Sequence, residues 1–283
     1  MKGLLPLFLG IFGTFAFSWV GLTVVPNLQI GSLNPQTDEE GGDVYPSPPS
    51  GMVLRGARVY AANGCVYCHS QQVRPDYGGA DLERKWGERR SAPRDYIFEP
   101  IVFLGKMRTG PDLANVGHRP ALQEKGAATP PPAPAASVSP APATTAAVSP
   151  VPAAGTQPAP NVATSAPSLV ADVQFLTADG KPLPYTAAWH HRHLYNPRSM
   201  SEDSNMPAFR FLYEKRRITG TASPDALNFV GDKEEQPNEG WEIVPSYDAK
   251  CLVAYLMSRD QAHELKEAKS PAIAAAPGKE AKK

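Results

Sequence analysis

The sequence contains only three cysteines in 283 residues, and its charges balance, with 28 Lys and Arg against 28 Asp and Glu. Three cysteines argue against a disulfide scaffold, since two of them share one short motif and Cys251 stands alone. A chain with no excess of positive charge gives no reason to expect nucleic-acid binding. The indications of function are therefore local motifs.

Charge is absent from the segment between Gly3 and Val25, which is rich in Leu, Phe, Val and Gly. As a helix this segment would be about 35 Å long, enough to cross the roughly 30 Å hydrocarbon core of a bilayer. A cleaved signal peptide would have a shorter apolar core and a small-x-small cleavage site, to which the residues around Val25 are a poor match. We predict a retained membrane anchor over residues 1–26, with Lys2 favouring a cytoplasmic N-terminus.

Charge is also absent from Gly126 to Ala171, where Pro, Ala, Ser, Thr and Val dominate. Frequent proline prevents helices and central strands, and the small apolar side chains cannot build a core. We therefore predict a disordered, semi-extended insertion. The predicted organisation is an anchor at 1–26, a tether at 27–50, a folded domain in two parts at 51–119 and 173–263 around an insertion at 120–172, and a disordered tail at 264–283.

Three segments of the folded domain are predicted to be helices, namely Met52–Asn63, 186–195 and Asp248–His263. They indicate a mainly α fold. We expect the first and last of these helices to cross, because Gly56 would permit a close approach to Tyr255.

Cys65, Cys68 and His69 form the C-x-x-C-H pattern that attaches c-type haem. Two thiols three positions apart on one helical turn can form thioethers to the two vinyl groups of one porphyrin, and the imidazole can ligate the iron. A zinc site would need two further ligands at suitable spacing. A redox dithiol needs no adjacent histidine and normally lies near a βαβ pattern. The motif therefore predicts one covalently bound haem c.

A second axial ligand must come from elsewhere in the chain. Met206 precedes Pro207 in a polar loop, and the proline would fix that loop so that the thioether points inward. A thioether ligand raises the reduction potential relative to a second histidine. Met107 and Met200 are rivals, although core packing is the ordinary role of methionine, and His118 is a further alternative as sixth ligand.

The turn at Gly110 and Pro111 is predicted to place the proline carbonyl against the Nδ1–H of His69. Such a contact fixes the imidazole ring and makes the ligand more basic. Arg74 and Arg108 are candidates to pair with the haem propionates, because a planar guanidinium suits a carboxylate. Together with the helices, this His/Met arrangement predicts a class I cytochrome c-like domain after the anchor.

Two weaker signals have ordinary explanations. His190, His191 and His193 could bind a metal, but no carboxylate or cysteine nearby completes a site, so hydrogen bonding within the domain or at a subunit contact is favoured. The run Arg84, Lys85, Arg89, Arg90 and Arg94 is expected to be a solvated face, with steering of an acidic partner as the alternative.

Taken together, the motifs resemble the mono-haem subunit II of cbb3-type cytochrome c oxidases. The resemblance follows the single anchor and rests, in this order, on Gly64–Pro75, Arg108–Gly117, Trp189–Arg198 and Ser204–Pro207. The extension Cys-His-Ser-Gln-x-x-Arg-Pro is specific, since generic cytochromes c do not carry it. Residues 120–185 depart from the family, which usually passes between the flanking segments in a few residues.

The resemblance implies a non-catalytic electron-transfer subunit of a proton-translocating oxidase. It implies that electrons arrive from a di-haem subunit or a soluble cytochrome c and leave for the haem b of the catalytic haem-copper subunit, where dioxygen is reduced. The expected location is a bacterial inner membrane, with one span and the haem domain on the periplasmic face.

Two other functions share parts of this pattern. The anchored mono-haem subunit of a nitric oxide reductase has the same one-span, one-haem architecture, but the Ser-Gln-x-x-Arg-Pro extension argues against it. A haem-based sensor would leave the iron five-coordinate or weakly ligated, so that a gas could bind.

Overall fold

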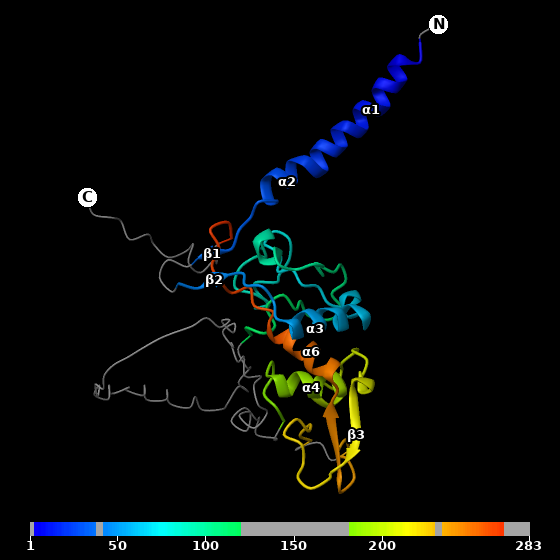
Figure 1. Ribbon diagram of the computed structural model, residues 1–283, viewed down its shortest axis with the longest axis vertical. Coiled ribbons are helices and arrows are strands. Elements are labelled where there is room, and N and C mark those ends of the chain that lie inside the picture. The colour runs from blue at the N-terminus through cyan, green and yellow to red at the C-terminus, as the bar shows by residue number, and fades with distance from the viewer. Residues whose placement is uncertain (1–2, 38–41, 120–180, 230–233, 269–283) are drawn as a thin grey trace, which may run out of the picture.

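The computed structural model describes residues 3–37, 42–119, 181–229 and 234–268. The predicted insertion at 120–172 and the last part of the predicted tail, 269–283, lie outside the described residues. The described part is mainly helical, as the sequence predicts, and it adds two small antiparallel sheets that the sequence did not indicate (Figure 1).

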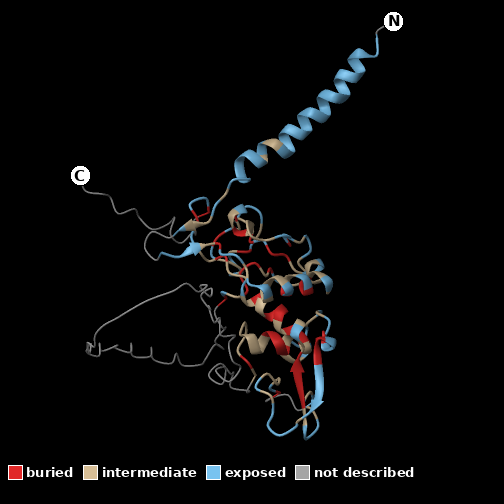
Figure 2. Ribbon diagram, in the orientation of Figure 1, coloured by how far each residue is buried: buried red, intermediate tan, exposed pale blue. Residues whose placement is uncertain are grey.

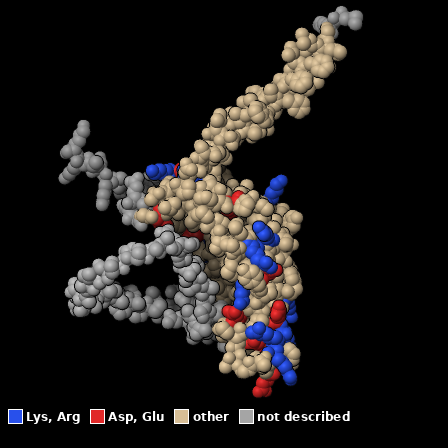
Figure 3. All heavy atoms as spheres, in the orientation of Figure 1, with Lys and Arg blue, Asp and Glu red and all other residues tan. Residues whose placement is uncertain are grey.

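One long apolar helix projects from the body of the molecule (Figure 1). It consists of α1 (Leu5–Trp19), a π-helical turn (Val20–Val24) and α2 (Val25–Ile30). A wider turn directly before Pro26 is physically reasonable, because proline clashes with the carbonyl four residues earlier in a regular α-helix. The 26 residues are long and apolar enough to cross a membrane, and Figure 3 shows this helix without charged side chains. The helix continues past residue 26, where the tether was predicted to begin.

The body is built on a crossing of α3 (Gly51–Ala62) with α6 (Tyr247–Met257). Each helix begins at a serine whose hydroxyl accepts a hydrogen bond from the backbone, as good N-caps do: Ser50 for α3 and Ser246 for α6. At the crossing, a Cβ on Gly56 would lie 2.0 Å from the carbonyl oxygen of Cys251 and 2.6 Å from the Cβ of Tyr255. The close approach expected from the sequence is therefore confirmed.

The prediction that the last helix runs to His263 is wrong at its end, because α6 stops at Met257. Beyond that point the backbone bonds to another segment instead of continuing the helix. The carbonyl of Arg259 accepts from the amide of Gly117 at 2.9 Å, and the amide of Gln261 donates to the side chain of Asn115 at 2.8 Å. These distant partners are invisible in a local helical pattern.

The second part of the domain supplies α4 (Ala187–Tyr195), α5 (Pro197–Met200) and the antiparallel pair β3 (Tyr213–Arg217) and β4 (Trp241–Pro245). A second short pair, β1 (Gln36–Thr37) and β2 (Val44–Tyr45), lies in the segment predicted as a tether. Within the residues that the structure describes, 3₁₀ turns lie at Cys65–Tyr67, Pro93–Tyr96 and Arg210–Leu212.

The core lies where α3, α4, α6 and β4 meet, and Figure 2 shows its buried residues along α6 and β4. Tyr60 of α3 and Tyr255 of α6 are almost fully buried, with ring centroids 5.5 Å apart. Leu194 of α4 and Ile243 of β4 join the same cluster. The two parts of the domain, far apart in sequence, therefore share one core.

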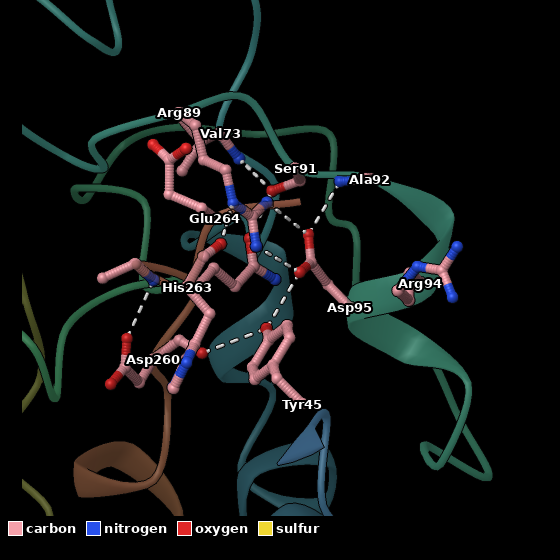
Figure 4. Close-up of polar contacts among 12 residues, drawn as sticks. Tyr45, Val73, Arg89, Ser91, Ala92, Arg94, Asp95, Asp260, His263 and Glu264 are labelled. Atoms are coloured by element: carbon pink, nitrogen blue, oxygen red, sulfur yellow. Dashed lines mark hydrogen bonds and ion pairs between the residues drawn. The ribbon is translucent and has the colours of Figure 1, made fainter. Parts of the chain in front are cut away.

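A second buried centre, shown in Figure 4, lies around Arg89, which is 1 % exposed. Its guanidinium donates two hydrogen bonds to Asp95, at 2.7 and 3.0 Å, and a third to the carbonyl of His263. The hydroxyl of Tyr45 donates to the same carboxylate at 2.8 Å. The prediction of a solvated basic face is therefore wrong for Arg89, whereas Arg84, Lys85 and Arg90 are exposed.

The predicted disordered tail at 264–283 is wrong for its first residues. Leu265 and Ala268 are buried against Ala92, and the side chain of Glu267 accepts a hydrogen bond from Arg94 at 2.7 Å. Apolar burial and an ion pair fix this segment beside the Arg89 centre.

We expect Asp95→Asn to lower the free energy of unfolding by about 3–5 kcal/mol, because it leaves the buried guanidinium of Arg89 without a counter-ion. Urea titration followed by circular dichroism would measure the loss. Arg55→Gln, which breaks the exposed pair with Asp248, is the matched control and should change stability little. Equal effects of the two variants would contradict the structural role given to Asp95.

Candidate functional site

The C-x-x-C-H motif begins directly after α3 ends. Gly64 has φ 70°, in the left-handed region that glycine adopts at no cost, and it turns the chain into the 3₁₀ segment Cys65–Tyr67. The amides of Cys68 and His69 both donate to the carbonyl of Cys65, at 3.1 and 2.9 Å. This compact turn brings the two thiols and the imidazole to one side of a cavity.

The cavity has a volume of about 390 Å³, within the range of small-molecule sites. Its lining comes from four segments of the chain: Asn63–Cys65 with Cys68 and His69, then Thr109–Pro111, then Tyr185, Trp189 and His193 of the α4 region, and the loop containing Ser201, Asp203–Pro207 and Phe209. The structure thus brings Cys65, Cys68, His69, Pro111 and Met206, all predicted from sequence, to one place.

His69 is held by the contact that the sequence predicts. Its Nδ1 lies 2.8 Å from the carbonyl oxygen of Pro111, which can only accept, so Nδ1 carries the proton and Nε2 is left with a lone pair. Burial is the main cause that lowers the pKa of this imidazole, which favours its neutral form. The ring is therefore in the tautomer and charge state of a metal ligand.

Gly110 gives His69 the space that this contact needs. A Cβ at position 110 would lie 2.2 Å from Cε1 and 2.6 Å from Nδ1 of the ring. The amide of Gly110 also donates to the carbonyl of Cys68 at 3.0 Å, which ties the turn to the motif. A side chain at this position would displace the imidazole.

Asp112 is a site residue that the sequence reasoning missed. Its fully buried carboxylate accepts from the hydroxyl of Ser70 at 2.6 Å and from the amides of Gln72 and Ala114 at 2.8 and 2.9 Å. These bonds join the chain after the motif to the chain after Pro111. The sequence feature that could have revealed Asp112 is its position directly after the Gly-Pro turn, where an acidic side chain can accept hydrogen bonds from several backbone amides.

Met206 lies in the cavity lining, half-buried, in a loop fixed at both ends. Its amide donates to the hydroxyl of Ser204 at 3.2 Å, and the amide of Phe209 donates to the carbonyl of Leu194 on α4 at 2.8 Å. The other candidates for the sixth ligand lie outside the cavity lining. Met107, Met200 and His118 do not line the cavity, and His118 is exposed beside Asp260.

Neither arginine expected at the haem propionates lines the cavity. Arg108 forms an ion pair with Asp81 and donates to the carbonyl of Gln72 at 2.8 Å. The backbone amide of Arg74 bonds the same Asp81 at 2.7 Å. The charge of Arg108 is thus neutralised within the protein, and the structure gives no support to the propionate role predicted for these two residues.

The three histidines of α4 lie in different surroundings. His191 contacts the hydroxyl of Tyr213 at 3.1 Å, so hydrogen bonding within the domain is confirmed for it. His193 stacks on Trp189 with ring centroids 4.5 Å apart and lines the cavity. Burial is the main cause that lowers the pKa of His190 to about 3 and of His191 and His193 to about 4, so all three are neutral at pH 7.

The protein groups that line the cavity have the chemistry needed to hold haem. Two thiols, one neutral imidazole with a free Nε2 and one thioether line the same cavity, which is the set that a covalent His/Met haem requires. Desolvation by burial raises the pKa of the Cys65 thiol to about 11, so this thiol is protonated at neutral pH. In the described residues no cluster of three His, Cys, Asp or Glu suggests another metal site.

A comparison with known families agrees with this site. The family model described as cytochrome c oxidase, mono-haem subunit/FixO, matches residues 5–140 and 180–240. The match covers more than half of the chain and includes every residue that lines the cavity. The unmatched stretch between the two ranges overlaps the block predicted as an insertion. No curated protein matches the chain.

We expect Gly110→Ala to weaken the axial bond of His69, because the new Cβ would push the ring from the Pro111 carbonyl. Haem should stay attached through the thiols, while the visible spectrum changes and the reduced protein binds carbon monoxide. Thr109→Ala, one residue earlier in the same lining, is the control and should keep the parent spectrum. A parent-like spectrum for Gly110→Ala would show that the ring tolerates the methyl group.

Proposed function

Because the chain belongs to the FixO family, the mono-haem subunits of cbb3-type cytochrome c oxidases, we propose that it relays electrons through one covalently bound haem c to the catalytic subunit. The observation that carries this proposal is the single cavity lined by Cys65, Cys68, His69 and Met206, with His69 already oriented by Pro111. Bound haem would supply a one-electron iron couple at this place.

Each residue has a distinct role in the proposal. Cys65 and Cys68 would hold the porphyrin by thioethers, so that it would stay in place between electron transfers. His69 and Met206 would be the protein ligands of the iron, which would keep small molecules away from it. Pro111 fixes the imidazole of His69, so the position of this ligand would change little with the charge of the iron.

The long apolar helix at the start of the chain fits membrane attachment. The apolar helix Leu5–Ile30 would anchor the domain in a bacterial inner membrane, with the haem domain on the periplasmic face. We propose that the partners are the catalytic haem-copper subunit and a di-haem cytochrome subunit, with a soluble cytochrome c as a further donor. Oxygen reduction and proton translocation then belong to the catalytic partner.

We expect Met206→Leu to lower the reduction potential and to open the sixth position of the iron, because leucine supplies no thioether. A spectroelectrochemical titration, with and without carbon monoxide, would measure both effects. Met200→Leu, on α5 and outside the cavity, should leave potential and spectrum unchanged. Rapid carbon monoxide binding by the parent protein would instead favour a gas sensor and overturn the relay.

Purification of the tagged chain from its native membranes tests the assembly. We expect a haem-copper subunit and a di-haem cytochrome to accompany it, and we expect the haem of this chain to be reoxidised by dioxygen in the complex. A chain that purifies alone, with haem that stays reduced in air, would contradict the proposed function.

A further inference from the structure

The chain between the membrane helix and the haem domain is fixed to that domain, although the sequence predicts a tether there. α2 ends at Ile30, and residues 31–33 separate it from Asn34. The carbonyl of Asn34 accepts a hydrogen bond from the guanidinium of Arg94. Because four residue steps span at most about 14 Å, the end of the membrane helix lies close to this first point of attachment. Figure 1 shows the two short strands that follow, β1 and β2, at the base of the helix.

Arg94 joins three segments of the chain. It lies in the 3₁₀ turn Pro93–Tyr96 of the haem domain, and it bonds Asn34 on the anchor side. Its guanidinium also donates to both carboxylate oxygens of Glu267, at 2.7 and 3.5 Å. The side chain of Arg94 is 17 % exposed, so salt screens this ion pair less than one on the open surface. One side chain therefore holds the segments that precede and follow the haem domain.

Gln36 adds a second connection between the same segments. Its side-chain amide donates to the carbonyl of Glu264 and accepts from the amide of Lys266, at 3.2 Å each. A glutamine that bonds the backbone through both its donor and its acceptor fixes the direction of that backbone as well as its distance. Figure 1 shows β1, which begins at Gln36, beside the red segment that contains these partners.

Tyr45 attaches the neighbouring strand, β2, to the second buried centre (Figure 4). Its hydroxyl donates to Asp95 at 2.8 Å and lies 3.2 Å from the carbonyl oxygen of Asp260. Its ring stacks on His263, with centroids 4.3 Å apart. Since β2 pairs with β1, the two strands are fixed to the domain at separate points, which leaves the domain little freedom to swing on the anchor.

The side chains of this junction, Gln36, Tyr45 and Arg94, do not line the cavity. Tyr45 packs against Ala92, Leu265 and Ala268, a buried cluster separate from the main core. The junction can therefore be loosened without moving the ligands of the iron. What it fixes is the position of the haem domain relative to the anchor.

Electron transfer slows steeply as the distance between donor and acceptor grows, and a haem on a free tether would be close to its acceptor in only some of its positions. We propose that Gln36, Tyr45 and Arg94 are positioning residues, which hold the haem domain in one orientation relative to the membrane helix and so keep the haem at one distance from an acceptor in the membrane. This inference rests on the proposed function, since it requires both a haem and that acceptor. It assigns the rate of the relay, and not the potential of the haem, to residues outside the haem site.

The test uses the full-length, haem-loaded chain in oriented bilayers, where the EPR signal of the ferric haem depends on the angle between the membrane normal and the magnetic field. The parent should show a strong angular dependence. Tyr45→Ala/Arg94→Gln should lose most of it while keeping the visible spectrum and the midpoint potential of the parent. Arg55→Gln/Tyr247→Ala is the matched control, because it makes the same two substitutions in an exposed contact of α3 with α6, and it should keep the dependence.

In the assembled oxidase, electron transfer from this haem to the catalytic subunit should be slower by roughly tenfold or more in Tyr45→Ala/Arg94→Gln and unchanged in the control. Flow-flash spectroscopy would measure the rate. An unchanged rate would overturn the inference, because the partner and not the junction would then set the orientation. A parent without angular dependence, or a variant that keeps the dependence of the parent, would overturn it as well.

A second variant covers the case in which Tyr45→Ala/Arg94→Gln yields no holoprotein. Gln36→Ala/Arg94→Gln removes two side chains that are only partly buried, and an angular dependence equal to that of the parent would again overturn the inference. The proposed function fails by a different result. Absence of haem from the parent, or a parent haem that dioxygen does not reoxidise in the complex, would overturn the relay itself.

Discussion

The hydrogen bond between Nδ1 of His69 and the carbonyl of Pro111 is the constraint on which the site depends, because it fixes both the tautomer and the direction of the ring. The carbonyl can approach so closely only because Gly110 has no side chain. The buried carboxylate of Asp112 then ties the same loop to Ser70, directly after the motif. A ring held in this way loses little rotational freedom when it binds a metal, so the ligand is preorganised.

The helix crossing sets the position of this loop relative to the thiols. α3 leads directly into Cys65, and its contact with α6 at Gly56 places that end of the helix. α6 ends at Met257, whose carbonyl oxygen would lie 2.1 Å from a Cβ on Gly117. One helix therefore positions both the motif and the far end of the Pro111 loop. The two close contacts, each made at a glycine, explain how sequence changes outside the cavity would still move its walls.

What could be predicted from the sequence was the chemistry that needs fixed local spacing: the motif, the Gly-Pro turn and the methionine before a proline. Which charged side chains are buried, and with which partners they pair, could not be predicted in the same way. Arg89 stands in a run of basic residues, yet it is buried because Asp95 and the carbonyl of His263 lie around it in space. The end of α6 at Met257, before the predicted His263, also depends on residues far away in the sequence. Beyond Met257 the backbone bonds to Gly117 instead of continuing the helix. Burial and long-range pairing are properties of the fold, and a local pattern does not contain them.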